Sequence, residues 1–178
     1  KEHELEYQLS DLQARVIVAA DVLLPIVDKV FGKTALQHVF VVRYGDLLPD
    51  APSLNVPAEL LQMKANAEPF PEGTEDFLAI TRSGAASPAV TLSMDDVALM
   101  TYTSGTTGLP KGAMLSYGNA LFKTAAAANC NGVKSGDVLL SIAPLYHIAG
   151  MLMGINCPVY AGATSVLLYR FDPVAVLQ

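Results

Sequence analysis

The chain has 178 residues, and its 52% hydrophobic content is enough for an ordinary buried core and too high for a disordered protein. Its formal net charge is −6, and its eleven Lys and Arg residues form no basic run, which argues against a nucleic-acid partner. Composition therefore predicts one compact unit over residues 1–178.

Two cysteines, Cys130 and Cys157, are too few for a disulfide framework, and neither has a second Cys or a His at metal-ligand spacing. We interpret both as reduced core residues. Residues 1–11 are highly charged where a secretory signal would be apolar, so we predict a cytoplasmic protein.

The first half of the chain alternates between helical and extended patterns. In chain order, periodicity predicts a helix carrying Leu5, Leu9 and Leu12, a strand at 15–20, a helix at 23–31 ending at Gly32, and a strand at 38–42. Residues 49–76 carry five prolines, and residues 83–92 are rich in Ser and Ala. We expect both to be surface connections around a short helix at 58–65.

The second half continues the alternation. The sequence predicts a strand at 97–100, a loop, a second strand at 113–115, and a helix from the N-cap Ser116 to about 128. A strand at 138–142, a helix at 148–159 ending near Gly162, a strand at 164–169, and a helix that begins at Asp172 and Pro173 are predicted to follow. Such alternation is typical of an α/β fold, a layered and mainly parallel sheet flanked by helices.

Residues 138–169 contain no Asp, Glu, Lys or Arg, which suggests a membrane span by hydropathy alone. Pro, Gly, His and Asn residues interrupt the stretch throughout, so a buried strand, a buried helix and a second buried strand fit it better. Peripheral membrane association stays open.

The most informative segment is Tyr-Thr-Ser-Gly-Thr-Thr-Gly-Leu-Pro-Lys-Gly at 102–112, which lies between two apolar runs and is predicted to be a strand-to-strand turn. We expect its glycines to take positive φ and to let the backbone approach an anion closely. Hydroxyls and one mobile lysine charge add donors for phosphates. The predicted phosphate-binding residues are Thr103, Ser104, Gly105, Thr106, Thr107, Gly108 and Lys111.

A Walker A loop would need Gly-Lys-Ser/Thr five residues after Gly105, but that position is Pro110. The segment instead resembles the phosphate loop of the adenylate-forming, AMP-binding superfamily, which includes acyl-CoA synthetases, adenylation domains of peptide synthetases, and luciferases. The resemblance covers nearly all 178 residues as an internal part of the family's large N-terminal domain.

A second segment, Pro-Leu-Tyr-His-Ile-Ala-Gly at 144–150, follows a predicted strand and begins a predicted helix. Alone, a His among apolar residues is more often a core side chain than a functional one. The segment is similar to the family's aromatic-containing motif, however. The resemblance implies that His147 is catalytic and that Tyr146, His147 and Gly150 line the acyl-substrate pocket, near the same sheet edge as the phosphate loop.

The resemblance implies a two-step reaction: a carboxylate attacks the α-phosphorus of ATP, and a thiol then displaces AMP to give an acyl-CoA. ATP, Mg²⁺ and CoA would be required, with Thr106 a candidate for the ATP-bound Mg²⁺. No acidic residue lies in 138–169 to bind a substrate α-amino group, so a fatty or aryl acid is favoured over an amino acid. Leu145, Ile148, Met151 and Met153 suit an acyl chain, or an ordinary core.

The chain opens at Lys1 without an initiator methionine, and the family's later motifs have no counterpart. We therefore expect a fragment that lacks the C-terminal domain and is inactive alone. Two alternatives stay open: an adenylate-forming enzyme with another acyl acceptor, and a non-catalytic remnant that only binds a nucleotide or a partner.

Overall fold

A computed structural model describes residues 1–52, 56–65, 69–103 and 108–177. Its backbone contacts separate two compact units, Lys1–Pro88 and Ala89–Gln178, each described here by itself. That both units belong to one larger domain stays a prediction.

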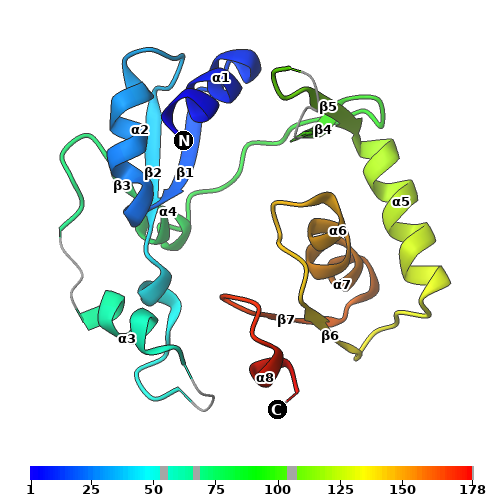
Figure 1. The fold of residues 1–178 in the computed structure, drawn as a ribbon. Helices are drawn as coiled ribbons and strands as arrows, with labels where there is room; N and C mark the ends of the chain where they lie inside the picture. The colour runs from blue at the N-terminus through cyan, green and yellow to red at the C-terminus, as the bar shows by residue number, and fades with distance from the viewer. Residues whose placement is uncertain (53–55, 66–68, 104–107, 178) are drawn as a thin grey trace. The chain divides into compact units, whose positions relative to one another are not determined.

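The first unit contains a three-stranded parallel sheet in the order β1-β2-β3 (Figure 1). The strands are β1 (Val16–Ala20), β2 (His38–Val42) and β3 (Glu75–Asp76), with Val16 opposite His38 and Phe40 opposite Glu75. Helix α1 (Glu2–Leu12) precedes β1, and a 3-10 turn (Asp21–Leu23) leads into α2 (Leu24–Phe31), which connects β1 to β2. The predicted helices and strands of residues 1–42 are confirmed.

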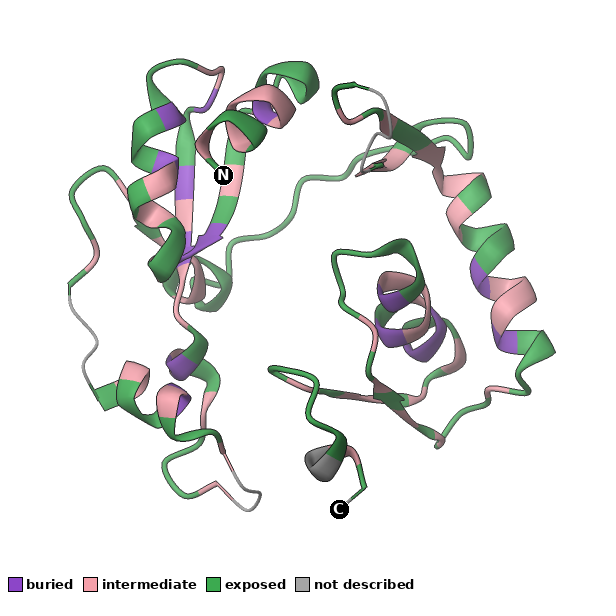
Figure 2. Ribbon diagram, in the orientation of Figure 1, coloured by how far each residue is buried: buried purple, intermediate pink, exposed green. Residues whose placement is uncertain are grey.

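The core of this unit forms where α1 and α2 pack against β1 and β2. Val27 of α2 packs with Ala19, Val39 and Val41, and a neighbouring cluster joins Leu9, Val30 and Leu36. Figure 2 shows buried positions on α1, α2, β1 and β2. Burial of such aliphatic side chains, each stabilising by roughly 1.5–3 kcal/mol, holds the layers together.

The predicted surface connection at 49–76 is partly wrong. Helix α3 (Ala58–Ala65) was expected, but β3 and the following helix α4 (Phe77–Arg82) were not. Asp76 begins α4 as its N-cap, since its Oδ1 accepts from the N–H groups of Leu78 at 2.8 Å and Ala79 at 3.2 Å. A further 3-10 turn (Tyr44–Leu47) follows β2.

The second unit contains two small sheets joined by helix α5 (Tyr117–Cys130). Strands β4 (Val97–Tyr102) and β5 (Gly112–Ser116) are antiparallel, whereas β6 (Val138–Ser141) and β7 (Thr164–Leu167) are parallel. Ser116 caps α5 as predicted, and its hydroxyl accepts from the Asn119 N–H at 3.2 Å. The α/β class and the predominance of parallel pairing are confirmed.

The uncharged stretch at 138–169 forms a strand, a helix and a second strand. The helical part is α6 (Ile148–Met151), a π-helical turn (Leu152–Asn156) and α7 (Cys157–Ala161), and it ends at Gly162, whose φ is +69°. Helix α8 (Pro173–Val176) follows β7. None of the helices in the described ranges combines the length and the apolar character that a bilayer crossing requires.

The two cysteines occupy different environments. Cys157 is buried, as predicted, and burial raises the pKa of its thiol. Cys130 is exposed, so its assignment to the core is wrong. It is the last residue of α5, where the helix leaves the packed face and ends in solvent.

Candidate functional site

The predicted phosphate loop joins the two strands of the β4–β5 hairpin, as expected for a strand-to-strand turn. Tyr102 lies opposite Gly112, and beyond this pair the Thr103 N–H donates to the Lys111 carbonyl oxygen at 3.0 Å. The hairpin therefore brings both ends of the loop together. Four predicted loop residues lie outside the described part of the chain: Ser104, Gly105, Thr106 and Thr107.

The prediction of positive φ for the loop glycines is wrong for Gly112. At Gly108 it stays a prediction, because this angle depends on Thr107, which lies outside the described residues. Gly112 instead lies close to two side chains of β4, because a Cβ there would lie 2.5 Å from Met100 Sδ and 3.2 Å from the Tyr102 ring. Gly108 faces open space, since a Cβ at this position would have no atom of the described residues within 4 Å. The described part of the chain therefore gives no packing reason for glycine at position 108.

The side chains of Thr103 and Lys111 are exposed where the loop leaves the hairpin. The Lys111 ammonium makes no ion pair with any residue in the described ranges. A mobile cation beside a hydroxyl, on a rigid hairpin, is suited to an anionic ligand. This arrangement fits a triphosphate, and the phosphate contacts themselves stay predictions.

His147 forms the N-cap of α6. Its ring Nδ1 accepts a hydrogen bond from the Ala149 N–H at 3.2 Å. Its backbone N–H donates to the Pro144 carbonyl oxygen at 3.0 Å, and its backbone carbonyl oxygen accepts from the Met151 N–H at 3.0 Å. Because Nδ1 is the acceptor, the neutral imidazole is assigned its proton on Nε2. The exposed ring can thus donate from Nε2 to a ligand while Nδ1 holds the helix start.

Gly150 is buried against the turn that carries His147. A Cβ at this position would overlap the carbonyl oxygen of Pro144 and crowd that of Ala143. Gly150 thereby sets the distance between α6 and the turn, and so the position of His147. Tyr146, by contrast, is 90% exposed. The acyl-pocket roles of Tyr146, His147 and Gly150 stay predictions.

A cavity of about 580 Å³ lies within the second unit, beside the start of α6. It is lined by residues of β4, β5, α5 and the 148–156 helix: Leu99, Leu115, Asn119, Ala120, Phe122, Lys123, Ile148, Ala149, Leu152 and Asn156. Of the four side chains expected to suit an acyl chain, only Ile148 lines it. Sequence reasoning missed the α5 wall, although the i, i+4 spacing of Asn119 and Lys123 places them on one helix face.

The strand before His147 and the strands that flank the phosphate loop belong to different sheets among the described residues. β6 pairs with β7, and the loop belongs to the separate β4–β5 pair. The expectation that His147 and the loop lie at one edge of a common sheet is therefore wrong, although both belong to the second unit.

The described residues contain no group of three His, Cys, Asp or Glu side chains that could hold a metal ion. The predicted Mg²⁺ contact, Thr106, is outside the described ranges. A single hydroxyl suits a metal that arrives with the phosphates of a nucleotide and keeps most of its water ligands.

The fold defines the class of protein. Similar solved structures include a long-chain-fatty-acid-CoA ligase from Archaeoglobus fulgidus, 28% identical with a TM-score of 0.67, and ATP-bound MatB from Rhodopseudomonas palustris, 26% identical with a TM-score of 0.66. Each match covers 99% of this chain and 30% of the other. An anthranilate CoA ligase with anthranoyl-AMP shares the fold at 24% identity and a TM-score of 0.73, covering 97% of this chain and 29% of that one.

Sequence comparison then fixes the family. The model of the AMP-binding enzyme family matches residues 1–178, so the chain belongs to that family and the resemblance found in its sequence is confirmed. A Bacillus subtilis long-chain-fatty-acid–CoA ligase is 31% identical over 99% of this chain and 32% of its own length. A Rhodopseudomonas palustris 4-hydroxybenzoate–CoA/benzoate–CoA ligase is 32% identical over 97% of this chain and 28% of its own length. The chain thus spans about a third of the length of these relatives.

Proposed function

We propose that this chain is part of an AMP-forming acid–CoA ligase, which adenylates a carboxylic acid with ATP and transfers the acyl group to CoA. The observation that carries the proposal is the β4–β5 hairpin, which presents the Tyr102–Gly112 sequence in a chain of the AMP-binding enzyme family. Relatives named as fatty-acid and aryl-acid CoA ligases support the same reaction class.

The roles of the phosphate loop follow from charge. Carboxylate and triphosphate are both anions, so the site must neutralise charge before they react. Lys111, Thr103 and the loop hydroxyls bind the phosphates in this proposal, with Thr106 near the Mg²⁺ of MgATP. Mg²⁺, when bound, withdraws charge from the phosphoryl oxygens and supports departure of pyrophosphate.

His147 would act on the acid. Its Nε2–H is exposed and free to donate, while Nδ1 is held by the α6 backbone, so the ring is oriented without other side chains. Donation to the carboxylate of the acid would place that group for attack on the α-phosphorus. The adjoining apolar cavity, whose lining includes no carboxylate among the described residues, favours an acid without an α-amino group. A fatty acid is the preferred substrate in this proposal, and an aryl acid is the alternative.

This chain alone is proposed to be inactive, because it spans about a third of the length of its relatives and none of its described residues is assigned to the adenine or the ribose. We also propose a cytoplasmic location. An enzyme with a different acyl acceptor remains the second candidate, since none of the described residues is assigned a contact with CoA.

The test is carboxylate-dependent ATP–pyrophosphate exchange, measured on this chain and on the longer protein that contains it, across short, long-chain and aryl acids. Exchange by the longer protein alone is expected. Lys111→Ala should weaken exchange, whereas Lys134→Ala is the matched control because Lys134 is a lysine in the turn after α5, away from the hairpin.

Two results would contradict the proposal in distinguishable ways. Exchange by this chain alone, with contamination excluded, would remove the claim of inactivity. No exchange by the folded longer protein with Mg²⁺ present would remove adenylation and favour a remnant that only binds.

A further inference from the structure

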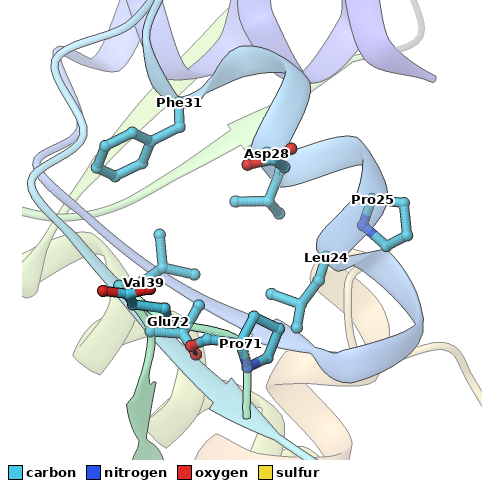
Figure 3. Close-up of a pocket in the computed structure, with 10 residues that line it drawn as sticks. Leu24, Pro25, Asp28, Phe31, Val39, Pro71 and Glu72 are labelled. Atoms are coloured by element: carbon cyan, nitrogen blue, oxygen red, sulfur yellow. Dashed lines mark hydrogen bonds between the residues drawn. The ribbon is translucent and has the colours of Figure 1, made fainter.

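A second pocket lies in the first unit, remote in sequence from the phosphate loop. It has a volume of about 470 Å³ and opens between α2, β2 and the turn at 71–74. Figure 3 shows Leu24 and Phe31 extending from α2 toward the side that carries Pro71 and Val39. The pocket floor is therefore apolar, and its volume is in the range of small-molecule sites.

The charged groups of this pocket are of one sign. Asp28 stands on the α2 side and Glu72 on the turn side, both exposed, and neither forms an ion pair with another residue in the described ranges. Among the described residues that line the pocket, none is Lys, Arg or His. The two lysines of α2 and the turn after it, Lys29 and Lys33, both lie within 4.0 Å of the Glu2 carboxylate.

We propose that this pocket binds a small organic monocation with an apolar body, such as an arylalkyl ammonium. The apolar body fills the space between Leu24, Val39 and Pro71, and the ammonium group remains at the rim near the two carboxylates. Phe31 is 39% exposed, and its ring adds an attractive surface for a cation. This pocket belongs to the first unit of the chain, whereas the phosphate loop belongs to the second.

The ligand class follows from the cost of desolvation. An anion would meet two like charges without any compensating donor, and a neutral ligand would gain only the apolar contacts. An ammonium group at the rim keeps part of its hydration while the negative charge of the lining attracts it. Among ligands of the same shape, the pocket should therefore bind a cation most tightly, a neutral molecule less tightly and an anion least tightly.

The experiment titrates the 178-residue chain with 4-phenylbutylamine, 4-phenylbutanol and 4-phenylbutanoate at pH 7, following amide NMR signals. The signals of Gly73 and Thr74 should shift on saturation, because both residues line the pocket. The ammonium should bind roughly two- to fivefold more tightly than the alcohol, as expected for one exposed ion pair. Added salt should reduce this difference in the unmodified chain.

The matched variants are Asp28→Asn/Glu72→Gln and Asp46→Asn/Asp95→Asn, which change the net charge equally, and neither control carboxylate lines the pocket. The first pair should reduce ammonium affinity to that of the alcohol, and the second should leave it unchanged. Equal binding of all three ligands, equal effects of the two variants, shifts away from the pocket, or no binding to the folded chain would each overturn the proposal.

Discussion

The capping role of His147 and its proposed donor role use different ring nitrogens, so two substitutions can separate them. His147→Ala removes both nitrogens. His147→Asn retains an acceptor that can cap α6, because Asn is among the favoured N-cap residues, but it offers no group at the place of Nε2. The two variants should therefore differ in stability and agree in loss of activity.

The stability difference can be estimated from the cap geometry. One exposed hydrogen bond of 3.2 Å, from the Ala149 N–H to Nδ1, is lost in His147→Ala. Removing a favoured N-cap costs about 0.5–2 kcal/mol, and the exposed position places this cap near the lower end of that range. We expect about 0.5–1 kcal/mol for Ala, measured by urea unfolding of the 178-residue chain, and a near-zero change for Asn.

The effect on activity is measured on the longer protein by carboxylate-dependent ATP–pyrophosphate exchange. Loss of the Nε2–H donor should reduce exchange in both variants by up to about tenfold, the equivalent of about 1.4 kcal/mol for one hydrogen bond. An Asn variant as unstable as the Ala variant would refute the capping assignment. An Asn variant with full exchange would refute the donor role of Nε2.

Two further predictions concern stability. Gly150→Ala should destabilise the chain by about 1–3 kcal/mol, because its Cβ would overlap the Pro144 carbonyl. Gly32→Ala is the control and should be neutral or slightly stabilising, because Gly32 has a φ of −75° and its Cβ would meet no atom of the described residues within 4 Å. Equal unfolding midpoints for the two variants would contradict the packing argument. The Lys33 ammonium lowers the pKa of Glu2 below its ordinary 4.5, so the stabilisation from this pair is complete above about pH 4.5 and is lost as pH falls through the lowered pKa. The thermal unfolding midpoint of Glu2→Gln should therefore be lower than that of the unmodified chain at neutral pH, and the two midpoints should converge in acid. A difference in midpoint that persists in acid would count against the stabilising role of the Glu2–Lys33 pair.

The sequence predicted best those elements whose signals are local and repeated. The β-branched run at 38–42 forms β2 with the predicted bounds, and Ser116 caps α5 where expected. Helix α4 was missed because it is six residues long, too short for a periodic signal, and begins just after a segment dominated by prolines. Its cap, Asp76, was the one local signal available.

Predictions that depend on long-range contacts were less successful. Cys130 has the apolar character of a core residue, but its place at the last turn of α5 exposes it. Neither the pairing of β6 with β7 nor the wall that α5 gives to the cavity can be deduced from spacing alone. Such features depend on which faces meet, and this is set by the whole packing arrangement.

The glycines of the phosphate loop show how the structure refines a motif. Positive φ would have explained Gly112 through the backbone alone, but Gly112 does not adopt it. Gly112 has a packing explanation, because a Cβ there would make the side chains of Met100 and Tyr102 shift whether or not a ligand is bound. Gly108 has no such reason among the described residues, which leave the space around it open. The role of Gly108 in phosphate binding therefore rests on the sequence motif and on the proposed function, and packing among the described residues neither requires nor excludes it.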